Sequence, residues 1–237
     1  MQNYKHEFIE FLESAGVLKF GDFTAKSGRR IPYFINAGEI KTGGRIRKLG
    51  EFYAKAYFEK LGDKRAVLYG PAYKGIPIAV SAASALSENG LDVPFFFNRK
   101  EEKDHGEGGV FVGYKPTAGE EIVIVEDVIT AGTAIRESMA ILSSLEGAKV
   151  AAAFVMVDRC EKGRGERSAM AEVGEEFGFP VYSVVNLHIG ASTFIIVIQL
   201  HQTMIYRAKF TDNIRNILFI RQCNMCIVLL PRSVLIE

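Results

Sequence analysis

Two adjacent carboxylates, Glu126 and Asp127, are followed closely by a run of small and hydroxyl-bearing residues at 130–133. Four apolar residues, 122–125, precede the acids, and an amphipathic helical pattern begins directly after the small residues. A buried strand that enters a helix through such a turn presents backbone N–H groups at the helix N-terminus, where they bind phosphate. The paired acids can accept hydrogen bonds from sugar hydroxyls. The stretch 121–137 therefore predicts a site for a ribose 5-phosphate.

Two further segments place cations where they can act on a charged ligand. The turn 70–75 (GPAYKG) carries Lys74 beside Tyr73 and precedes a helical pattern, although an ordinary glycine-capped connection explains it equally well. The segment 99–109 is rich in charge and in glycine, which is typical of a hinged lid, whereas most mixed-charge loops are simply solvated. Its cationic residues are Arg99, Lys100, Lys103 and His105.

The elements that must position these segments alternate along the chain. Apolar runs predict strands at 66–69, 93–97, 110–114, 122–125, 149–157 and 181–185. Apolar residues at helical spacing predict helices at 45–61, 76–87, 135–145 and 166–177. This alternation predicts βαβ units and a largely parallel sheet. Ligands of such sheets bind beyond the carboxyl ends of the strands, so the segments after Tyr69, Phe97, Asp127 and Val157 are expected at one edge.

The N-terminal region has a different pattern. Residues 4–15 have the period of an amphipathic helix that Gly16 ends, and 17–23 and 33–37 read as short strands. A basic turn, 26–30, joins these strands, and a solvated hairpin loop is its simplest interpretation.

Composition excludes several classes of protein. The 237 residues carry 29 Lys and Arg against 28 Asp and Glu, which argues against general nucleic-acid binding. Three cysteines, Cys160, Cys223 and Cys226, are too few for a disulfide framework, and the Cys223–Cys226 pair lacks further zinc ligands at a suitable spacing. The densest apolar run, 194–198, is far too short to cross a bilayer, and the polar N-terminus is unlike a signal peptide. A soluble cytoplasmic protein is expected.

Known nucleotide motifs are also informative. A G-x-G-x-x-G sequence after a first strand and a Walker A sequence are both absent. Instead, four segments and the pair Asp158-Arg159 resemble, in order, motifs of the orotate phosphoribosyltransferases, which belong to the type I phosphoribosyltransferases. The segments are 26–36 (KSGRRIPYFIN), 70–75 (GPAYKG), 98–106 (NRKEEKDHG) and 125–133 (VEDVITAGT). The resemblance extends from the N-terminus to about Leu187.

The resemblance implies an α/β fold, with a largely parallel sheet flanked by helices and a small N-terminal hood. It divides the chain into the hood at 1–40, a phosphoribosyltransferase core at 41–190 and a C-terminal segment at 191–237 that departs from the family pattern. The implied reaction joins orotate to the ribose of phosphoribosyl pyrophosphate. Mg²⁺ is the implied cofactor, held mainly through pyrophosphate and water rather than by a set of protein ligands. A homodimer that exchanges the 98–106 loop is implied as well.

The same resemblance assigns roles to individual residues. Glu126 and Asp127 hold the ribose hydroxyls. The 5′-phosphate is bound by Thr130, Ala131, Gly132 and Thr133. Pyrophosphate is contacted by Tyr73, Lys74, Arg99, Lys100, Lys103 and His105, of which Lys103 and His105 are catalytic together with Asp127. The orotate side is formed by Lys26, Phe34 and Arg159. Two alternatives remain open: a phosphoribosyltransferase for another base, and a regulator that senses phosphoribosyl pyrophosphate without chemistry.

Overall fold

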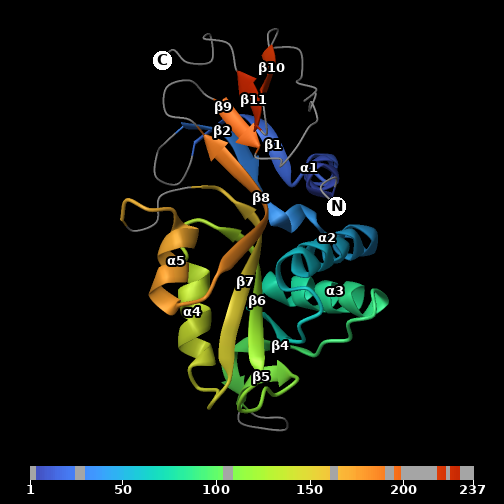
Figure 1. Cartoon of the computed structure of the whole chain (residues 1–237), viewed down its shortest axis with the longest axis vertical. Helices are drawn as coiled ribbons and strands as arrows, with labels where there is room; N and C mark the ends of the chain where they lie inside the picture. Colours follow the sequence, from blue (N-terminus) through green and yellow to red (C-terminus); the bar gives the residue numbers. More distant parts are fainter. Residues whose placement is uncertain are drawn as a thin grey trace. The chain divides into compact units, whose positions relative to one another are not determined.

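The computed structural model describes residues 4–24, 30–103, 109–160, 165–189, 195–198, 218–222 and 225–229 (Figure 1). The chain divides into two compact units. The larger unit is 41–184, and the smaller combines 1–40 with 185–237.

The larger unit is an α/β layer structure. Its sheet has the strand order β8-β7-β6-β3-β4-β5, in which β3 pairs in parallel with β4 and β6, and β6 pairs in parallel with β7. The strands are β3 (Val67–Gly70), β4 (Phe95–Lys103), β5 (Gly109–Gly113), β6 (Glu121–Ile129), β7 (Lys149–Asp158) and the first part of β8 (Val181–Ile189). The helices are α2 (Gly43–Leu61), α3 (Gly75–Glu88), α4 (Thr133–Leu142) and α5 (Ala169–Phe177). Helices α2 and α3 cover one face of the sheet, and α4 and α5 the other (Figure 1). The predicted fold class is confirmed.

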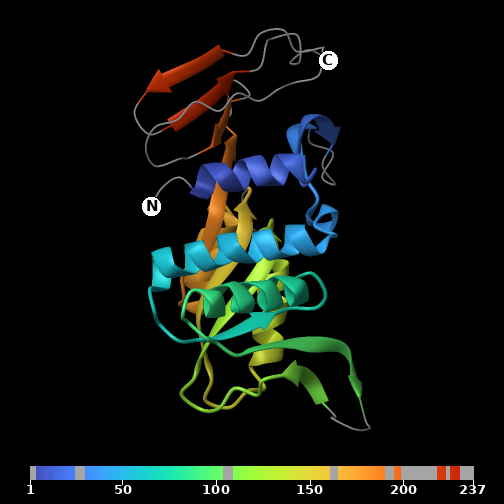
Figure 2. The ribbon, with the colours of Figure 1, turned by 90° about the vertical axis from the view of Figure 1, so that its right-hand side faces the viewer.

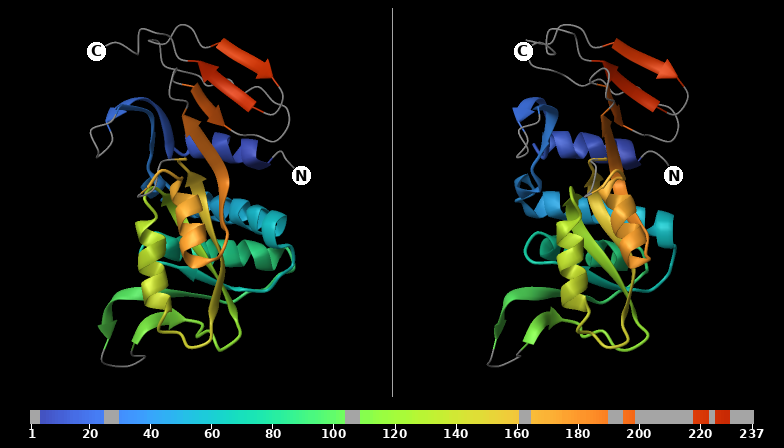
Figure 3. Two further views of the ribbon diagram at one scale, coloured as in Figure 1. Left: turned by 60° about the vertical axis from the view of Figure 1, so that its left-hand side comes forward. Right: turned by 90° about the vertical axis from the view of Figure 1, so that its left-hand side faces the viewer.

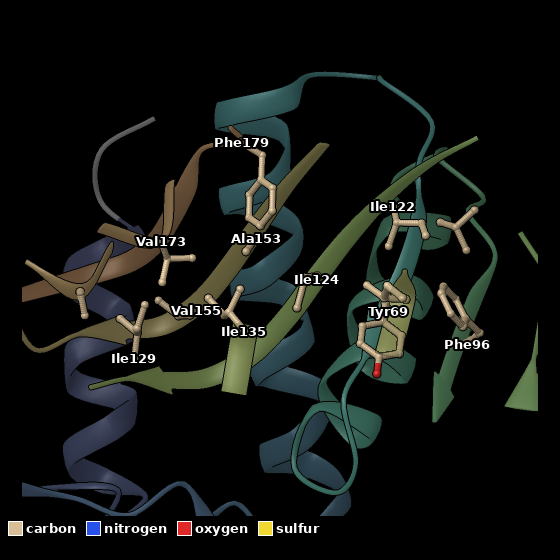
Figure 4. Close-up of a cluster of buried hydrophobic side chains, with 13 residues drawn as sticks. Tyr69, Phe96, Ile122, Ile124, Ile129, Ile135, Ala153, Val155, Val173 and Phe179 are labelled. Atoms are coloured by element: carbon tan, nitrogen blue, oxygen red, sulfur yellow. The ribbon is translucent and has the colours of Figure 1, made fainter. Parts of the chain in front are cut away.

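The core under α4 and α5 explains why this pattern folds into layers. Figure 4 shows side chains of the sheet, such as Tyr69 and Ile124, packed with Ile135 of α4 and Val173 of α5. Each of these four side chains is at most 2% exposed. Burying an apolar side chain of this size contributes roughly 1.5–3 kcal/mol. Figure 3 shows α4 and α5 side by side over β6 and β7, so the two helices close this face of the sheet.

Strands β4 and β6 extend further than predicted. Strand β4 does not end at Phe97 but continues to Lys103, and its outer part pairs antiparallel with β5 through Lys103 and Gly109. Figure 2 shows β4 and β5 as an arm that projects from the sheet. The charged residues therefore begin on a strand rather than in a loop, while 104–108 lie outside the described residues. Strand β6 likewise runs through both acids to Ile129.

The smaller unit contains the predicted helix and hairpin. Helix α1 (Tyr4–Ser14) buries Phe8 and Leu12. It is followed by β1 (Leu18–Thr24), β2 (Arg30–Ile35) and the short 3₁₀ helix η1 (Ala37–Glu39). Strands β1 and β2 pair antiparallel, which confirms the hairpin.

The C-terminal part of the smaller unit is not as predicted. The last strand was expected to end at Val185, but β8 continues to Ile189, where His188 pairs with Val197 of the next strand. That strand, β9 (Ile195–Ile198), pairs with β11 (Met225–Leu229), which in turn pairs with β10 (Leu218–Gln222), all antiparallel. The β-branched residues of β9 favour this strand structure. Cys223 lies outside the described residues.

Candidate active site

The two acids lie on β6 where the strand emerges from the core. Glu126 and Asp127 are 8% and 7% exposed. Local hydrogen bonds orient both carboxylates: Glu126 Oε1 accepts from the N–H of Asp127 at 2.9 Å, and Asp127 Oδ1 accepts from the N–H of Val128 at 2.7 Å. From α2, the hydroxyl of Tyr53 donates to the carbonyl of Glu126 at 2.5 Å. The carboxylates are therefore held in place before any ligand binds.

Burial changes the charge of this pair. It raises the pKa of Glu126 to about 8, and the neighbouring Asp127 carboxylate adds to this rise, while the Lys74 ammonium opposes it. Asp127 has a direct cationic partner, because Lys74 Nζ lies 2.9 Å from its Oδ2. In the free protein at neutral pH, Glu126 is therefore largely protonated beside an ion pair of Asp127 and Lys74.

The raised pKa of Glu126 gives a stability prediction. Between about pH 4.5 and 8 the folded protein keeps a proton that the unfolded chain releases, so this group lowers stability as pH rises. The variant Glu126→Gln removes the buried charge and is expected to melt roughly 5 °C higher than wild type at pH 8.5. Near pH 5 the difference should shrink.

Calorimetric or fluorescence melting at the two pH values measures this effect. Glu137→Gln, on the exposed part of α4, is the matched control and should show little change at either pH. A gain for Glu126→Gln that is equal at both pH values would contradict the titration.

The segment 130–133 forms the turn between β6 and α4. Gly132 has φ +75°, and a Cβ at this position would lie 2.5 Å from Cγ2 of Val173, so only glycine fits against α5. Arg136 fixes the turn: its Nη1 donates to the carbonyl of Ala131 at 2.6 Å, and its Nε donates to Glu176 on α5 at 2.7 Å. The first N–H groups of α4 have no acceptor within the helix, so they are available for an anion.

A cavity of about 280 Å³ lies between Glu126 and this turn. Its lining includes Glu126, Thr130, Gly132 and Thr133. A larger cavity of about 640 Å³, lined by residues such as Arg65 and Asp92, lies near the amino ends of the strands and contains none of the predicted site residues. The smaller cavity is the one that brings Glu126 and the start of α4 together.

The turn 70–75 lies next to the acids. A Cβ on Gly70 would lie 2.3 Å from the carbonyl oxygen of Gly75, so the turn closes backbone against backbone. The peptide bond between Ala72 and Tyr73 is cis. The Tyr73 ring is 68% exposed, and Lys100 Nζ lies 5.4 Å from its centre, which is a cation–π distance. The turn and the root of the β4–β5 arm therefore meet beside Asp127 and its partner Lys74.

The structure brings together most of the predicted site residues. At the carboxyl edge of the sheet lie Tyr73, Lys74, Lys100, Glu126, Asp127, Thr130, Ala131, Gly132 and Thr133. Arg159 directly follows Asp158, whose register partner on β6 is Ile129, and Arg99 donates to the carbonyl of Gly109 within the arm at 3.1 Å. Lys103 is the last residue of β4. Phe34 belongs to the smaller unit and is 44% exposed. Lys26 and His105 lie outside the described residues.

Three residues that orient the site were not predicted. Tyr53, Asn98 and Arg136 hold the backbone of the acids, of the 70–75 turn and of the phosphate turn, respectively. The asparagine that directly follows the apolar run 95–97 is a signal in the sequence that could have revealed such a role. Among the described residues, no group of three or more His, Cys, Asp or Glu side chains is placed to hold a metal ion.

Comparison with known proteins agrees with the fold and the site. Residues 36–181 match the phosphoribosyl transferase domain, so the class defined by the fold and the site is a phosphoribosyltransferase. The chain is 50% identical over 188 residues to the orotate phosphoribosyltransferase of Clostridium acetobutylicum. The aligned region covers 79% of this chain and 84% of the relative. It is 53% identical over 189 residues to that of Pseudomonas fluorescens, covering 79% of this chain and 87% of the relative. The crystal structure of the Francisella tularensis orotate phosphoribosyltransferase superposes with a TM-score of 0.68 at 40% identity, covering 76% of this chain and 85% of that one. The chain belongs to the orotate phosphoribosyltransferase family.

Proposed function

We propose that this chain transfers the 5-phosphoribosyl group of phosphoribosyl pyrophosphate to orotate, giving orotidine 5′-monophosphate and pyrophosphate, a step of UMP biosynthesis. The identity to curated orotate phosphoribosyltransferases over most of the chain supports this activity. The carrying observation is structural: Glu126 of β6 and the N-terminal turn of α4 line one cavity, and the adjacent Asp127 pairs with a lysine at the start of α3.

The acids and the phosphate turn bind the two ends of the ribose. Glu126 and Asp127 accept hydrogen bonds from the ribose hydroxyls, and the N–H groups of 130–133 bind the 5′-phosphate. With both ends held, the anomeric carbon is fixed in front of the nucleophile, which lowers the entropic part of the barrier. The ionised form of Glu126 is the stronger acceptor for hydroxyls, so binding is favoured as pH rises toward 8.

The cations act on the leaving group. The bond between C1 and the pyrophosphate oxygen breaks with its electron pair going to pyrophosphate, N1 of orotate forms the new bond to C1, and the N1 proton is released. Negative charge grows on the leaving group, where Lys74 and the cations of the arm stabilise it. The Lys74 side chain is 59% exposed, so its ammonium is accessible to pyrophosphate while it contacts Asp127.

The oxygen donors of the site fit a magnesium ion that is coordinated mainly by substrate oxygens and water. Glu126 offers hard oxygen atoms at the cavity and Asp127 offers them beside it, but Asp127 Oδ2 already contacts Lys74, and the described residues form no cage of three ligands. Mg²⁺ commonly keeps several waters and binds through one or two carboxylates and substrate phosphates. When bound, Mg²⁺ supplies positive charge that neutralises the departing pyrophosphate.

Orotate recognition, assembly and location complete the proposal. Arg159, at the carboxyl end of β7, provides a fork for the orotate carboxylate, with Lys26 and Phe34 as further contacts.

A homodimer whose 98–106 loops act in the neighbouring subunit is supported by the projecting β4–β5 arm (Figure 2). We propose a cytoplasmic location, and the net charge of +1 supports a protein that does not bind nucleic acid. Among the described residues, no helix has the length and apolar content needed to cross a bilayer.

The decisive experiment follows the ultraviolet absorbance of orotate with phosphoribosyl pyrophosphate and Mg²⁺. Absorbance should fall in proportion to enzyme and should recover when pyrophosphate is added to the products. Uracil, adenine and hypoxanthine are tested in parallel, because turnover of one of these in place of orotate would indicate a phosphoribosyltransferase for another base. Folded protein that binds phosphoribosyl pyrophosphate without any turnover would support a sensor and defeat the proposal.

A further inference from the structure

One buried carboxamide connects the two segments that are proposed to contact pyrophosphate. Asn98 lies on β4 and is 5% exposed. Its Oδ1 accepts two hydrogen bonds, from the hydroxyl of Tyr69 at 2.8 Å and from the N–H of Ala72 at 2.9 Å. Its Nδ2 donates to the carbonyl of Arg99 at 3.1 Å. The side chain thus joins the end of β3, the 70–75 turn and the root of the arm.

The surroundings permit only this orientation of the carboxamide. Tyr69 is fully buried among apolar side chains, as Figure 4 shows, and burial raises the pKa of its hydroxyl well above the usual range. A neutral phenol and a backbone N–H are both donors here, so the group between them must be an acceptor. The Arg99 carbonyl on the other side requires a donor. Asparagine supplies both, whereas an apolar residue would leave the N–H of Ala72 without this partner.

Asn98 lies between two segments that carry cations. Ala72 precedes Tyr73 and Lys74 in the turn, and Arg99 and Lys100 begin the arm. The register between β4 and β5 shifts after Asn98, so this residue marks the point where the arm departs from regular sheet pairing. The cation–π contact of Lys100 with Tyr73 joins the same two segments at their exposed side.

We propose that Asn98 is a positioning residue that holds the 70–75 turn against the root of the arm, so that both present their cations to pyrophosphate together. This inference rests on the proposed function, since it concerns the leaving group of that reaction. Asn98 acts through the backbone of Ala72 and Arg99 and does not touch the substrate itself.

The test compares two variants with matched controls. Asn98→Ala is expected to raise KM for pyrophosphate in the reverse reaction roughly 10-fold or more, while KM for orotidine 5′-monophosphate stays within about 2-fold. Tyr69→Phe removes one of the two donors and should give a smaller shift of the same kind. Asn98→Asp keeps the acceptor oxygen and should restore part of the affinity for pyrophosphate.

The controls make the same chemical changes away from the site. Asn89→Ala removes a carboxamide that donates to Ala85 at the end of α3, and Tyr57→Phe removes a hydroxyl that donates to the carbonyl of Lys64. Both should leave the KM for pyrophosphate unchanged. The double variant Tyr69→Phe/Asn98→Ala should show less than the product of the two single effects, because the residues share one hydrogen bond.

Several outcomes would overturn the inference. A lower melting temperature with both KM values unchanged, or with both raised equally, would reduce Asn98 to a structural residue. If Asn98→Ala fails to fold, an unchanged pyrophosphate KM in folded Tyr69→Phe would have the same consequence. If wild type shows no orotate turnover, the proposed function fails by itself, and calorimetric binding of pyrophosphate to wild type and Asn98→Ala still decides the role of Asn98.

Discussion

The variant Asp127→Asn is expected to lose roughly 10–100-fold in kcat/KM for phosphoribosyl pyrophosphate, because a hydrogen bond to a charged acceptor contributes about 1.5–3 kcal/mol. An amide can still accept from the N–H of Val128, so the turn after β6 should keep its shape. The neutral amide cannot form an ion pair with Lys74, and only its oxygen, not its nitrogen, can accept a ribose hydroxyl. The loss should therefore appear in ligand binding and turnover while the fold remains.

Steady-state kinetics and calorimetric titration with phosphoribosyl pyrophosphate measure this effect. Asp92→Asn, an exposed aspartate at the opposite edge of the sheet, is the matched control and should behave as wild type. Binding and kinetics of Asp127→Asn that both equal those of wild type would remove Asp127 from the site.

The variant Lys103→Ala is expected to lower kcat by roughly 100–1,000-fold, the usual effect of removing one group that stabilises transition-state charge. Lys103 is the last residue of β4, where it pairs with Gly109, the first residue of β5. The Lys103 ammonium is expected to stabilise the negative charge that develops on pyrophosphate in the transition state, so KM for orotate should change little. Lys115→Ala, an exposed lysine after β5, is the control. Steady-state rates that match wild type would exclude this role.

Mixing the two defective proteins tests whether the arm serves the neighbouring subunit. If it does, a dimer of one Lys103→Ala chain and one Asp127→Asn chain has one site with both defects and one intact site. Random exchange then restores about a quarter of wild-type activity, since half of the dimers are mixed and each has one intact site of two. If each arm acts on its own subunit, every site keeps a defect and activity stays low.

The fold could be predicted where burial imposes a period on the sequence. Strands such as β3 and β7 are buried runs between amphipathic helices, so their positions followed from hydrophobicity alone. The outer part of β4 could not be found this way, because Arg99 to Lys103 are all charged. Among the described strands, this part of β4 pairs with β5 alone. A projecting two-stranded arm buries little apolar surface, and hydrophobic periodicity therefore carries no signal for it.

The site residues also differ in whether they could be predicted from the sequence. Glu126, Asp127 and the turn 130–133 are neighbours in the chain, so their chemistry was visible as a local pattern. Tyr53 and Asn98 act on groups that are 73 and 26 residues away, and no local pattern reports a contact across that separation. Two of the three orienting residues thus depend on long-range contacts, whereas Arg136 acts on the carbonyl of Ala131 only five residues away in the chain.

The close approach of Gly70 and Gly75 limits how this enzyme can change. A Cβ on Gly75 would lie 2.9 Å from the carbonyl oxygen of Val125, and one on Gly70 would meet Gly75 itself. Both positions already carry the smallest residue, so a larger side chain at one cannot be accommodated by a second substitution at the other. Within this turn, tolerated substitutions are therefore expected at the four residues between the two glycines, 71–74.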